Sequence, residues 1–350
     1  MVRHLVFAVP GNIATPTGGY AYDRRIIAEL TQLGWRVDLI DLGEGFPWPD
    51  QATRASARTR LLARPAGHSI VVDGLALGVL PEAAAEVAGR NPLIALVHHP
   101  LALEMGVSPG QAEALRASER AALAVVQRVI VTSAATARLI ASDYGIPSER
   151  ITVATPGSDP APPVQGSRDG TMRLLSVGAV VPRKGYDILV AALATLTELP
   201  WRLTIAGDRT RDSHAVAQLD AEIACHGLGD RIATLGAVSA ERLAALYAEA
   251  DVFVLASHFE GYGMAYAEAV AHGLPVIGTT SGAIPETVPP DAGLLVPAGN
   301  VSAFASALRQ VVGEGGLRDR MAGASRAAAM GLPTWRQSAE VFARALETLT

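Results

Sequence analysis

Short apolar runs alternate along the chain with longer stretches whose apolar positions recur every three or four residues. The short runs predict buried strands, and the longer stretches predict helices packed against them. In the first half, strands are expected at residues 5–9, 36–41, 69–73, 93–97, 128–132 and 151–153. Helices are expected at residues 20–33, 52–63, 109–126 and 134–144. The alternation is typical of α/β folds with a parallel sheet.

A stretch rich in proline, glycine and serine, within residues 156–170, interrupts this series. Such composition is typical of a connection between domains. A second series follows, with strands expected at residues 172–177, 202–206, 231–235, 252–255 and 276–277 and helices after about residue 300. The sequence thus predicts two doubly wound domains, with bounds 1–160 and 171–334, a linker at 161–170, and a C-terminal helix at 335–350 that could pack back on the first domain.

Composition narrows the class of protein. The 350 residues are 49% apolar and carry a formal net charge of −5, which argues against a nucleic-acid-binding protein. Cys225 is the single cysteine, so neither a disulfide framework nor a cysteine-based metal site is expected. No apolar run reaches the length of a membrane span. The first residues lead directly into a strand and lack the features of a signal peptide. A cytoplasmic protein is the simplest interpretation.

One segment of the second half concentrates positive charge. Residues 177–185 follow its first strand and open a helix, and they contain Arg183 beside Lys184, the only lysine in the chain. Two cations at a helix start are unfavourable for the helix dipole unless an anion lies between them. Lysine and arginine are also not interchangeable, and a lone lysine among 29 basic residues indicates a site that needs a compact ammonium group. The segment therefore predicts phosphate binding.

A second segment, residues 257–286, combines acids with a glycine-rich helix start. Glu260 precedes the helix and Glu268 lies within it, while Gly261 and Gly263 leave the intervening loop backbone accessible. The N-terminus of a helix offers free N–H groups and a positive dipole end, which suit a phosphate. The spacing of the two acids suits a long ligand with one acid on each side of a diphosphate.

Glu260 and Glu268 match the E-x7-E signature of retaining glycosyltransferases, and this stretch resembles glycosyltransferase family 4. The segment from Gly282 to Glu286 resembles the G-x-P-E element of that family, and Gly157-Ser158-Asp159 resembles its hinge element. The resemblance implies the GT-B fold, two Rossmann-like domains with a cleft between them. It also implies a nucleotide-diphosphate sugar as donor, which we expect to be a UDP-sugar, and a hydroxyl group as acceptor.

The same resemblance assigns residues to the donor. Glu260, expected to be catalytic, would hold sugar hydroxyls, Glu268 the ribose, and the amides after Gly263 the diphosphate. In the family the segment 178–185 carries two separated cations, but Ala179 stands where the first is usual, and Arg183 could compensate. The expected donor-binding residues are Gly18, Gly19, Arg183, Lys184, Val238, Gly261, Tyr262, Gly263, Met264, Ala265 and Glu268.

Candidates for acceptor binding and catalysis follow strands of the first half. Asp73 ends the third expected strand, and His98 ends the fourth. Many family members have a histidine where Asp73 aligns, so either Asp73 takes that place or the role has moved to His98. His99, Glu104 and Asn12 are further candidates for acceptor contacts.

Four further points concern metal and cofactor, membrane docking, alternative functions and oligomeric state. A metal and a separate cofactor are not implied, because the cations already neutralise a diphosphate. A cluster of arginines at positions 54, 58, 60 and 64 could dock on a membrane surface, but residues 1–165 are not basic overall, so a soluble acceptor is favoured. A nucleotide-sugar epimerase and a non-catalytic nucleotide-sugar-binding protein are the alternative functions. The oligomeric state is not predicted.

Overall fold

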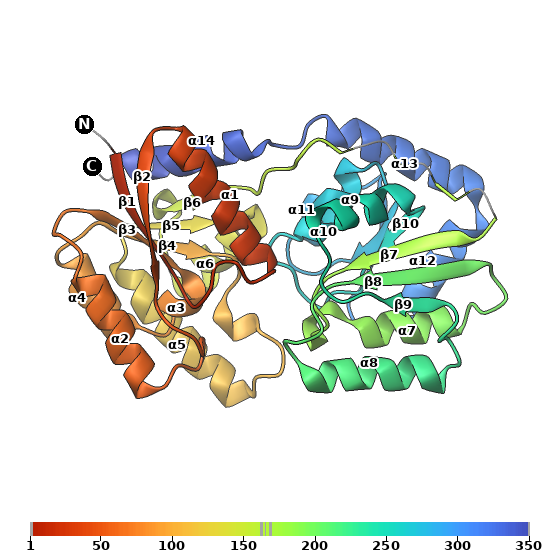
Figure 1. Ribbon diagram of the computed structural model, residues 1–350, viewed down its shortest axis with the longest axis horizontal. Helices are drawn as coiled ribbons and strands as arrows, with labels where there is room; N and C mark the ends of the chain where they lie inside the picture. Colours follow the sequence, from red (N-terminus) through yellow and green to blue (C-terminus); the bar gives the residue numbers. More distant parts are fainter. Residues whose placement is uncertain (1–2, 162–163, 165, 168–169, 349–350) are drawn as a thin grey trace. The chain divides into compact units, whose positions relative to one another are not determined.

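The computed structural model describes residues 3–161, 164, 166–167 and 170–348, and Figure 1 shows their arrangement. The chain divides into two compact units. The first comprises Met1–Gly157 and Pro333–Thr350, and the second comprises Ser158–Leu332. Five residues of the predicted linker, 162–163, 165 and 168–169, lie outside the described residues, as do the last two residues of the predicted C-terminal helix.

The first unit is built on a parallel sheet in the order β2-β1-β3-β4-β5-β6. Its strands are β1 (Arg3–Val9), β2 (Trp35–Asp41), β3 (Ser69–Asp73), β4 (Leu93–Val97), β5 (Arg128–Val131) and β6 (Ile151–Val153). Its helices are α1 (Gly18–Gln32), α2 (Gln51–Leu62), α3 (Gly74–Leu77), α4 (Pro81–Ala88), α5 (Pro109–Val125), α6 (Ala134–Tyr144) and α14 (Trp335–Glu347), with short 3-10 turns η1 (Leu101–Leu103) and η2 (Ser148–Arg150).

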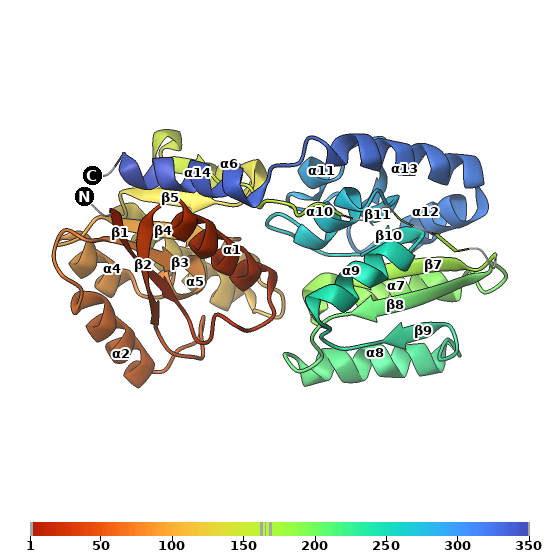
Figure 2. The same ribbon diagram turned by 45° about the horizontal axis from the view of Figure 1, so that its top comes forward.

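Helices cover both faces of this sheet. Leu61 of α2, Val87 of α4 and Ile140 of α6 share one core with strand residues such as Ile70. On the other face α14 packs beside α1, although more than 300 residues separate them in the chain (Figures 1 and 2). The rings of Phe7 and Phe342 stack there with centroids 6.4 Å apart. The C-terminal helix is therefore part of the core of the first unit.

The second unit contains another parallel sheet, in the order β12-β11-β10-β7-β8-β9. Its strands are β7 (Met172–Val177), β8 (Trp201–Ala206), β9 (Ile232–Thr234), β10 (Val252–Val254), β11 (Val276–Thr279) and β12 (Gly293–Val296). Its helices are α7 (Tyr186–Ala194), α8 (Ser213–Cys225), α9 (Ala240–Glu249), α10 (Met264–Ala271), α11 (Ile284–Thr287), α12 (Val301–Gly313) and α13 (Gly315–Ala329), with the 3-10 turn η3 (Pro182–Lys184).

In this unit α7 packs against both α8 and α12, whereas α10 packs against α13 (Figures 1 and 2). The order of strands reverses between β7 and β10, and in the first unit it reverses between β1 and β3. Ligands of doubly wound sheets bind outside the carboxyl ends of the strands at such a reversal. The topology therefore directs attention to the loops after β7 and β10 and to those after β1 and β3.

The prediction of two doubly wound α/β domains is confirmed, and some elements differ from it in detail. The helix expected at 20–33 begins at Gly18, because the Thr17 side chain caps it by accepting from the Tyr20 N–H. β12 was not predicted, since four half-buried residues give no clear periodicity. α3 and α4 were not predicted either, as they span only four and eight residues.

Candidate functional site

In the second unit, the loops after β7 and β10 are neighbours because their strands pair in the sheet. The first loop contains η3, and the second leads through Ser257 and Glu260 to α10. The His258 N–H donates to the Arg183 carbonyl oxygen across 2.8 Å, which joins the two loops. Side chains that lie 76 positions apart in the sequence thereby share one site.

Two glycines allow these loops to approach one another. Gly185 has a φ of +64°, and a Cβ there would lie 2.2 Å from the Ala256 carbonyl oxygen. Gly282 has a φ of +60°, and its Cβ would lie 2.2 Å from the Glu260 carbonyl oxygen, which accepts from the Ala283 N–H at 2.9 Å. Only glycine fits such conformations at this distance. The glycine of the G-x-P-E-like segment therefore supports the backbone of Glu260.

Glu260 is the buried centre of a cluster that we call the cation–carboxylate group, comprising Arg183, Lys184, Ser257 and Glu260. The Lys184 Nζ and the Ser257 Oγ each donate to its Oε1 at 2.6 Å. An Arg183 guanidinium nitrogen lies 3.2 Å from its Oε2. Glu260 is only 6% exposed. Both cations predicted to bind phosphate therefore converge on the acid predicted to bind the sugar.

The charges in this group shift the pKa values of its members. Burial alone would raise the pKa of Glu260, but the Lys184 ammonium and the Arg183 guanidinium outweigh burial and lower it to about 2. Burial lowers the pKa of Lys184, and Glu260 opposes that effect. Two cations face one carboxylate, and Arg211 adds a further positive charge near Lys184. The group thus has a surplus of positive charge, which an anionic ligand would balance.

Glu268, the second acid of the motif, lies on α10 and has its own partner. The Tyr247 hydroxyl of α9 donates to its Oε2 at 2.8 Å. The ring of Tyr247 in turn stacks on His272, with centroids 4.7 Å apart. Burial, with Asp159 adding to it, raises the pKa of Glu268 to about 7. Tyr247 was not predicted, although a tyrosine on the buried stripe of a helix is a candidate for holding a polar partner.

The other donor residues predicted in this unit lie at the same edge of the sheet. Gly261, Tyr262 and Gly263 form the loop before α10, and Met264 and Ala265 form its first turn. First-turn N–H groups lack acceptors within the helix, as an anion site requires. Val238 follows β9 and is half-buried against the core of the unit. Their contacts with a donor stay predictions.

In the first unit, three side chains lie close together: Asp23 of α1, Asp73 at the end of β3 and His98 after β4. We call them the carboxyl–imidazole group. The His98 Nε2 lies 3.2 Å from the Asp23 Oδ1 and 3.8 Å from the Asp73 Oδ2. The Asp73 Oδ1 accepts from the Leu75 N–H at 2.7 Å, which caps α3. Asp73 and His98, alternatives in the sequence, therefore belong to one cluster. One ligand atom from each of Asp23, Asp73 and His98 lies within 4.8 Å of the others.

Asp23 was not predicted. It lies on the stripe of α1 that also carries Ile26 and Leu30, at intervals of three and four residues, so an acid on a core-facing stripe was the available signal. Burial, with Asp23 adding to it, raises the pKa of Asp73 to about 7. Burial alone would lower the pKa of His98, but the two carboxyl groups outweigh it and raise that pKa.

The remaining candidates of the first unit lie outside this cluster of three. The His99 Nε2 pairs with the Glu104 carboxylate at 2.8 Å. The exposed Asn12 accepts from the Ala14 N–H at 2.8 Å and so shapes the loop after β1. Gly18 and Gly19 form the first turn of α1, and a Cβ on Gly19 would lie 3.2 Å from the His98 ring. Gly19 therefore makes room for His98, whatever its role toward a donor.

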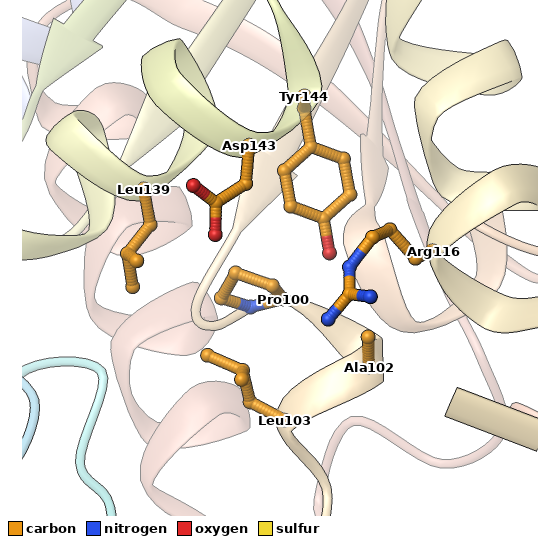
Figure 3. A pocket seen from close by; sticks show the side chains of 7 residues that line it. All are labelled: Pro100, Ala102, Leu103, Arg116, Leu139, Asp143 and Tyr144. Carbon is orange, nitrogen blue, oxygen red and sulfur yellow. The ribbon is translucent and has the colours of Figure 1, made fainter. Parts of the chain in front are cut away.

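Figure 3 shows a pocket beside the segment that follows His99, with side chains from η1, α5 and α6 around it. Its lining consists of Pro100, Ala102, Leu103, Arg116, Leu139, Asp143 and Tyr144. None of these seven is a predicted site residue, although Pro100 and Leu103 are chain neighbours of His99 and Glu104.

The arginine cluster on and beside α2 is engaged within its own unit. Arg58 pairs with Glu86 at 2.5 Å, and Arg54 and Arg60 donate to the carbonyl oxygens of Val79 and Asp41. These contacts give the cluster a structural role and leave membrane docking untested. Across the described part of the chain, every helix is too short or too polar to cross a bilayer.

Two family models match the chain. The model described as "Glycosyl transferases group 1" matches residues 159–328, and the model described as "Glycosyltransferase Family 4" matches residues 54–161. Together they cover residues 54–328. The first lies wholly in the second unit, around the cation–carboxylate group, and the second lies almost wholly in the first unit, around Asp73 and His98.

Curated relatives of the chain are also named as glycosyltransferases. The chain is 29% identical over 273 residues to the "MMP alpha-(1->4)-mannosyltransferase" of Mycolicibacterium hassiacum, covering 73% of this chain and 64% of that protein. It is 35% identical over 204 residues to the "D-inositol 3-phosphate glycosyltransferase" of Xylanimonas cellulosilytica, covering 53% of this chain and 48% of that protein. The matches thus span about half to two thirds of these relatives.

Solved structures share the fold across the whole chain. A sucrose-phosphate synthase from Thermosynechococcus elongatus superimposes with a TM-score of 0.82 at 21% identity, covering 99% of both chains. HepE from Anabaena, solved with UDP and glucose, superimposes with a TM-score of 0.77 at 19% identity, covering 99% of this chain and 100% of that one. The prediction of a GT-B fold is thereby confirmed.

Proposed function

The chain belongs to the family 4 glycosyltransferases, and from this premise we propose that it transfers a sugar from a nucleotide-diphosphate sugar to a hydroxyl group of an acceptor. We propose a UDP-sugar as the donor. This choice is supported by the fold shared with HepE, which has been solved with UDP and with UDP-glucose. The transfer would retain the anomeric configuration, with the acceptor attacking on the face from which the diphosphate leaves.

The surplus of positive charge around Glu260 carries this proposal. Lys184 and Arg183 are half-buried, and both pair with the single carboxylate of Glu260. An unbalanced buried charge is costly, so a site that maintains one is built for a ligand of opposite sign. The N-terminus of α10 adds its dipole at the same edge of the sheet. A diphosphate satisfies both features.

The chemistry follows from where charge develops. As the bond from the sugar to the diphosphate breaks, negative charge grows on the departing oxygen, and preorganised cations stabilise it most in a site that excludes water. Lys184, Arg183 and the first amides of α10 would supply that stabilisation. Glu260, fixed in its ionised form by Lys184, would accept hydrogen bonds from sugar hydroxyls. Glu268 would accept from the ribose.

In this proposal the first unit supplies the acceptor contacts. His98, with Asp73 behind it, would hold a hydroxyl near the reacting carbon, and His99 and Glu104 would contact the rest of the acceptor. A small, hydroxyl-rich acceptor is supported by the similarity to a relative named D-inositol 3-phosphate glycosyltransferase. A nucleotide-sugar epimerase or a non-catalytic binder would use the same donor site without an acceptor.

The first experiment is a thermal-shift panel with UDP, GDP, ADP and TDP, each with and without magnesium. We expect UDP to raise the melting temperature far more than the others, to the same extent in both conditions. Absence of a shift with every nucleotide would contradict donor binding. Incubation of UDP-sugars with candidate acceptors then separates the functions: a glycoside indicates transfer, an epimer indicates epimerisation, and unchanged donor indicates binding alone.

The protonation of Glu268 predicts how donor affinity depends on pH. Its pKa is about 7 in the free protein, so the carboxylate that accepts from the ribose is depleted below that pH. The dissociation constant of UDP-glucose, whose diphosphate does not titrate in this range, should fall by about tenfold between pH 6 and pH 8. Calorimetry at several pH values measures it. Glu268→Gln, which cannot ionise, should bind weakly and without this dependence, and an equal slope in this variant would exclude Glu268 as its origin.

Several finer features remain predictions that the same experiments address. Metal independence is tested by the magnesium arm of the panel. Retention is tested by the anomeric configuration of the glycoside. The cytoplasmic location expected from the sequence also stays a prediction.

A further inference from the structure

Asp23 is a buried acid with little to compensate it. Its side chain is 0% exposed, and its Oδ1 lies 3.2 Å from the His98 Nε2. The described residues provide no hydrogen-bond partner for its Oδ2. A charged group in such a position is costly unless it serves a fixed partner. His98 is that partner, and Asp73 is the second carboxyl group beside it.

We propose that Asp23 is a positioning residue for His98, holding the imidazole through Nε2 together with Asp73, so that the Nδ1–H is the group that meets the substrate. The inference rests on the proposed function only for the identity of that substrate, a hydroxyl or phosphate oxygen of the transfer reaction. The orientation of the ring and its charge are properties of the free protein.

The packing around the His98 ring indicates which of its two nitrogens can contact a ligand. A Cβ on Gly19 would lie 3.2 Å from the His98 Cδ2 and 3.4 Å from its Nε2, so this edge packs against α1. The ring of Tyr22 meets that of His98 edge to face at 5.5 Å, and its hydroxyl donates to the Ala154 carbonyl oxygen. The side-chain contacts of His98 to acids all use Nε2. The opposite edge, Nδ1–Cε1, is the one left for a ligand.

The charges of the group set the direction of that hydrogen bond. The titratable groups that face His98 are Asp23 and Tyr22 from α1 and Asp73 from β3. Burial and the neighbouring Asp23 raise the pKa of Asp73 to about 7. The negative charge of these carboxyl groups, next to Nε2, favours the imidazolium form of His98. His98 then donates from Nδ1 to an oxygen and does not act as a base.

Nitrogen-15 NMR of the whole chain labelled at histidine tests this without any assay of activity. We expect His98, assigned through the His98→Gln variant, to titrate above the ordinary range and to carry its proton on Nε2 once neutral. Asp23→Asn, which keeps the shape and removes the charge, should lower the midpoint by about one unit or more. Glu113→Gln, which changes an exposed acid of the same unit, should leave the midpoint unchanged.

Kinetics provide the second readout. The limb of the kcat profile that falls with rising pH should move to lower pH in Asp23→Asn, whereas the KM for the donor should hardly change. A merely structural role would lower the yield of folded protein and leave the limb in place. If Asp23→Asn does not fold, the spectrum of the wild-type protein still decides, because a neutral His98 with its proton on Nδ1 would overturn the proposal.

A metal ion is the competing explanation, since the same three side chains offer ligand atoms within 4.8 Å of one another. Chelator-treated protein should therefore be titrated with Zn²⁺ by calorimetry. We expect no stoichiometric binding that depends on Asp23. Binding of one ion per chain that is lost in Asp23→Asn would replace the positioning role with a metal site, while an unchanged His98 midpoint in that variant would exclude both.

Discussion

Replacing Lys184 with alanine is expected to weaken UDP binding by about 30- to 100-fold, because a charge-assisted contact in a buried site is lost. Calorimetry with UDP measures the change. Lys184→Arg should recover little of it. The Lys184 stem packs closely on residue 178, where even a Cβ would lie 3.0 Å from its Cε, and the planar guanidinium does not fit the place of an ammonium group.

Arg202→Ala is the matched control, since it removes one exposed cation of the same unit, on β8. It should leave UDP affinity within about twofold of wild type, because an exposed charge contributes little. A Lys184→Ala variant that binds UDP as tightly as the wild-type protein would refute the phosphate assignment.

Replacing Glu260 with alanine is expected to separate binding from transfer. The variant leaves Lys184 and Arg183 without their common carboxylate, so its free energy of unfolding should fall by about 3 kcal/mol. Loss of the carboxylate leaves a larger net positive charge, which favours a diphosphate. UDP should therefore still bind and should restore much of the lost stability. Transfer should fall by about 1000-fold, because the sugar loses the group that orients it.

Denaturant unfolding with and without UDP, together with kcat/KM, measures all three effects. Glu249→Ala is the control, since Glu249 is exposed and pairs with Arg242 on the surface at 3.1 Å. That change should cost less than about 0.5 kcal/mol and leave transfer intact. Full transfer activity in Glu260→Ala would show that the E-x7-E motif has been misassigned in this chain.

The donor-side candidates could be predicted from the sequence because they lie in local motifs. Lys184 stands out as a lone lysine, and Glu260 stands before a helix that local pattern identifies. Their direct contact could not be predicted, since it depends on β7 pairing with β10 across an intervening stretch of two other strands. Strand order is a property of the whole sheet, and no local spacing reports it.

The first unit shows the same limit more strongly. Asp73 and His98 could be identified as strand-end residues, but they remained alternatives because the sequence does not show that β3 and β4 present them to one another. Asp23 was not predicted as a site residue because an acid in a helix, followed by two arginines, is usually solvated. It is buried where α14 and His98, which follows β4, pack on α1 from distant parts of the chain.

The packing of α14 has a consequence for biosynthesis. The first unit consists of residues from both sides of the second, so its core is incomplete until α14 has been made. Phe342 stacks on Phe7, and Trp335 packs 6.0 Å from Tyr22, the neighbour of Asp23. The second unit is continuous and can form its core earlier in translation. The strands synthesised first therefore wait longest for their final partner, because α14 is made only after the second unit has been synthesised.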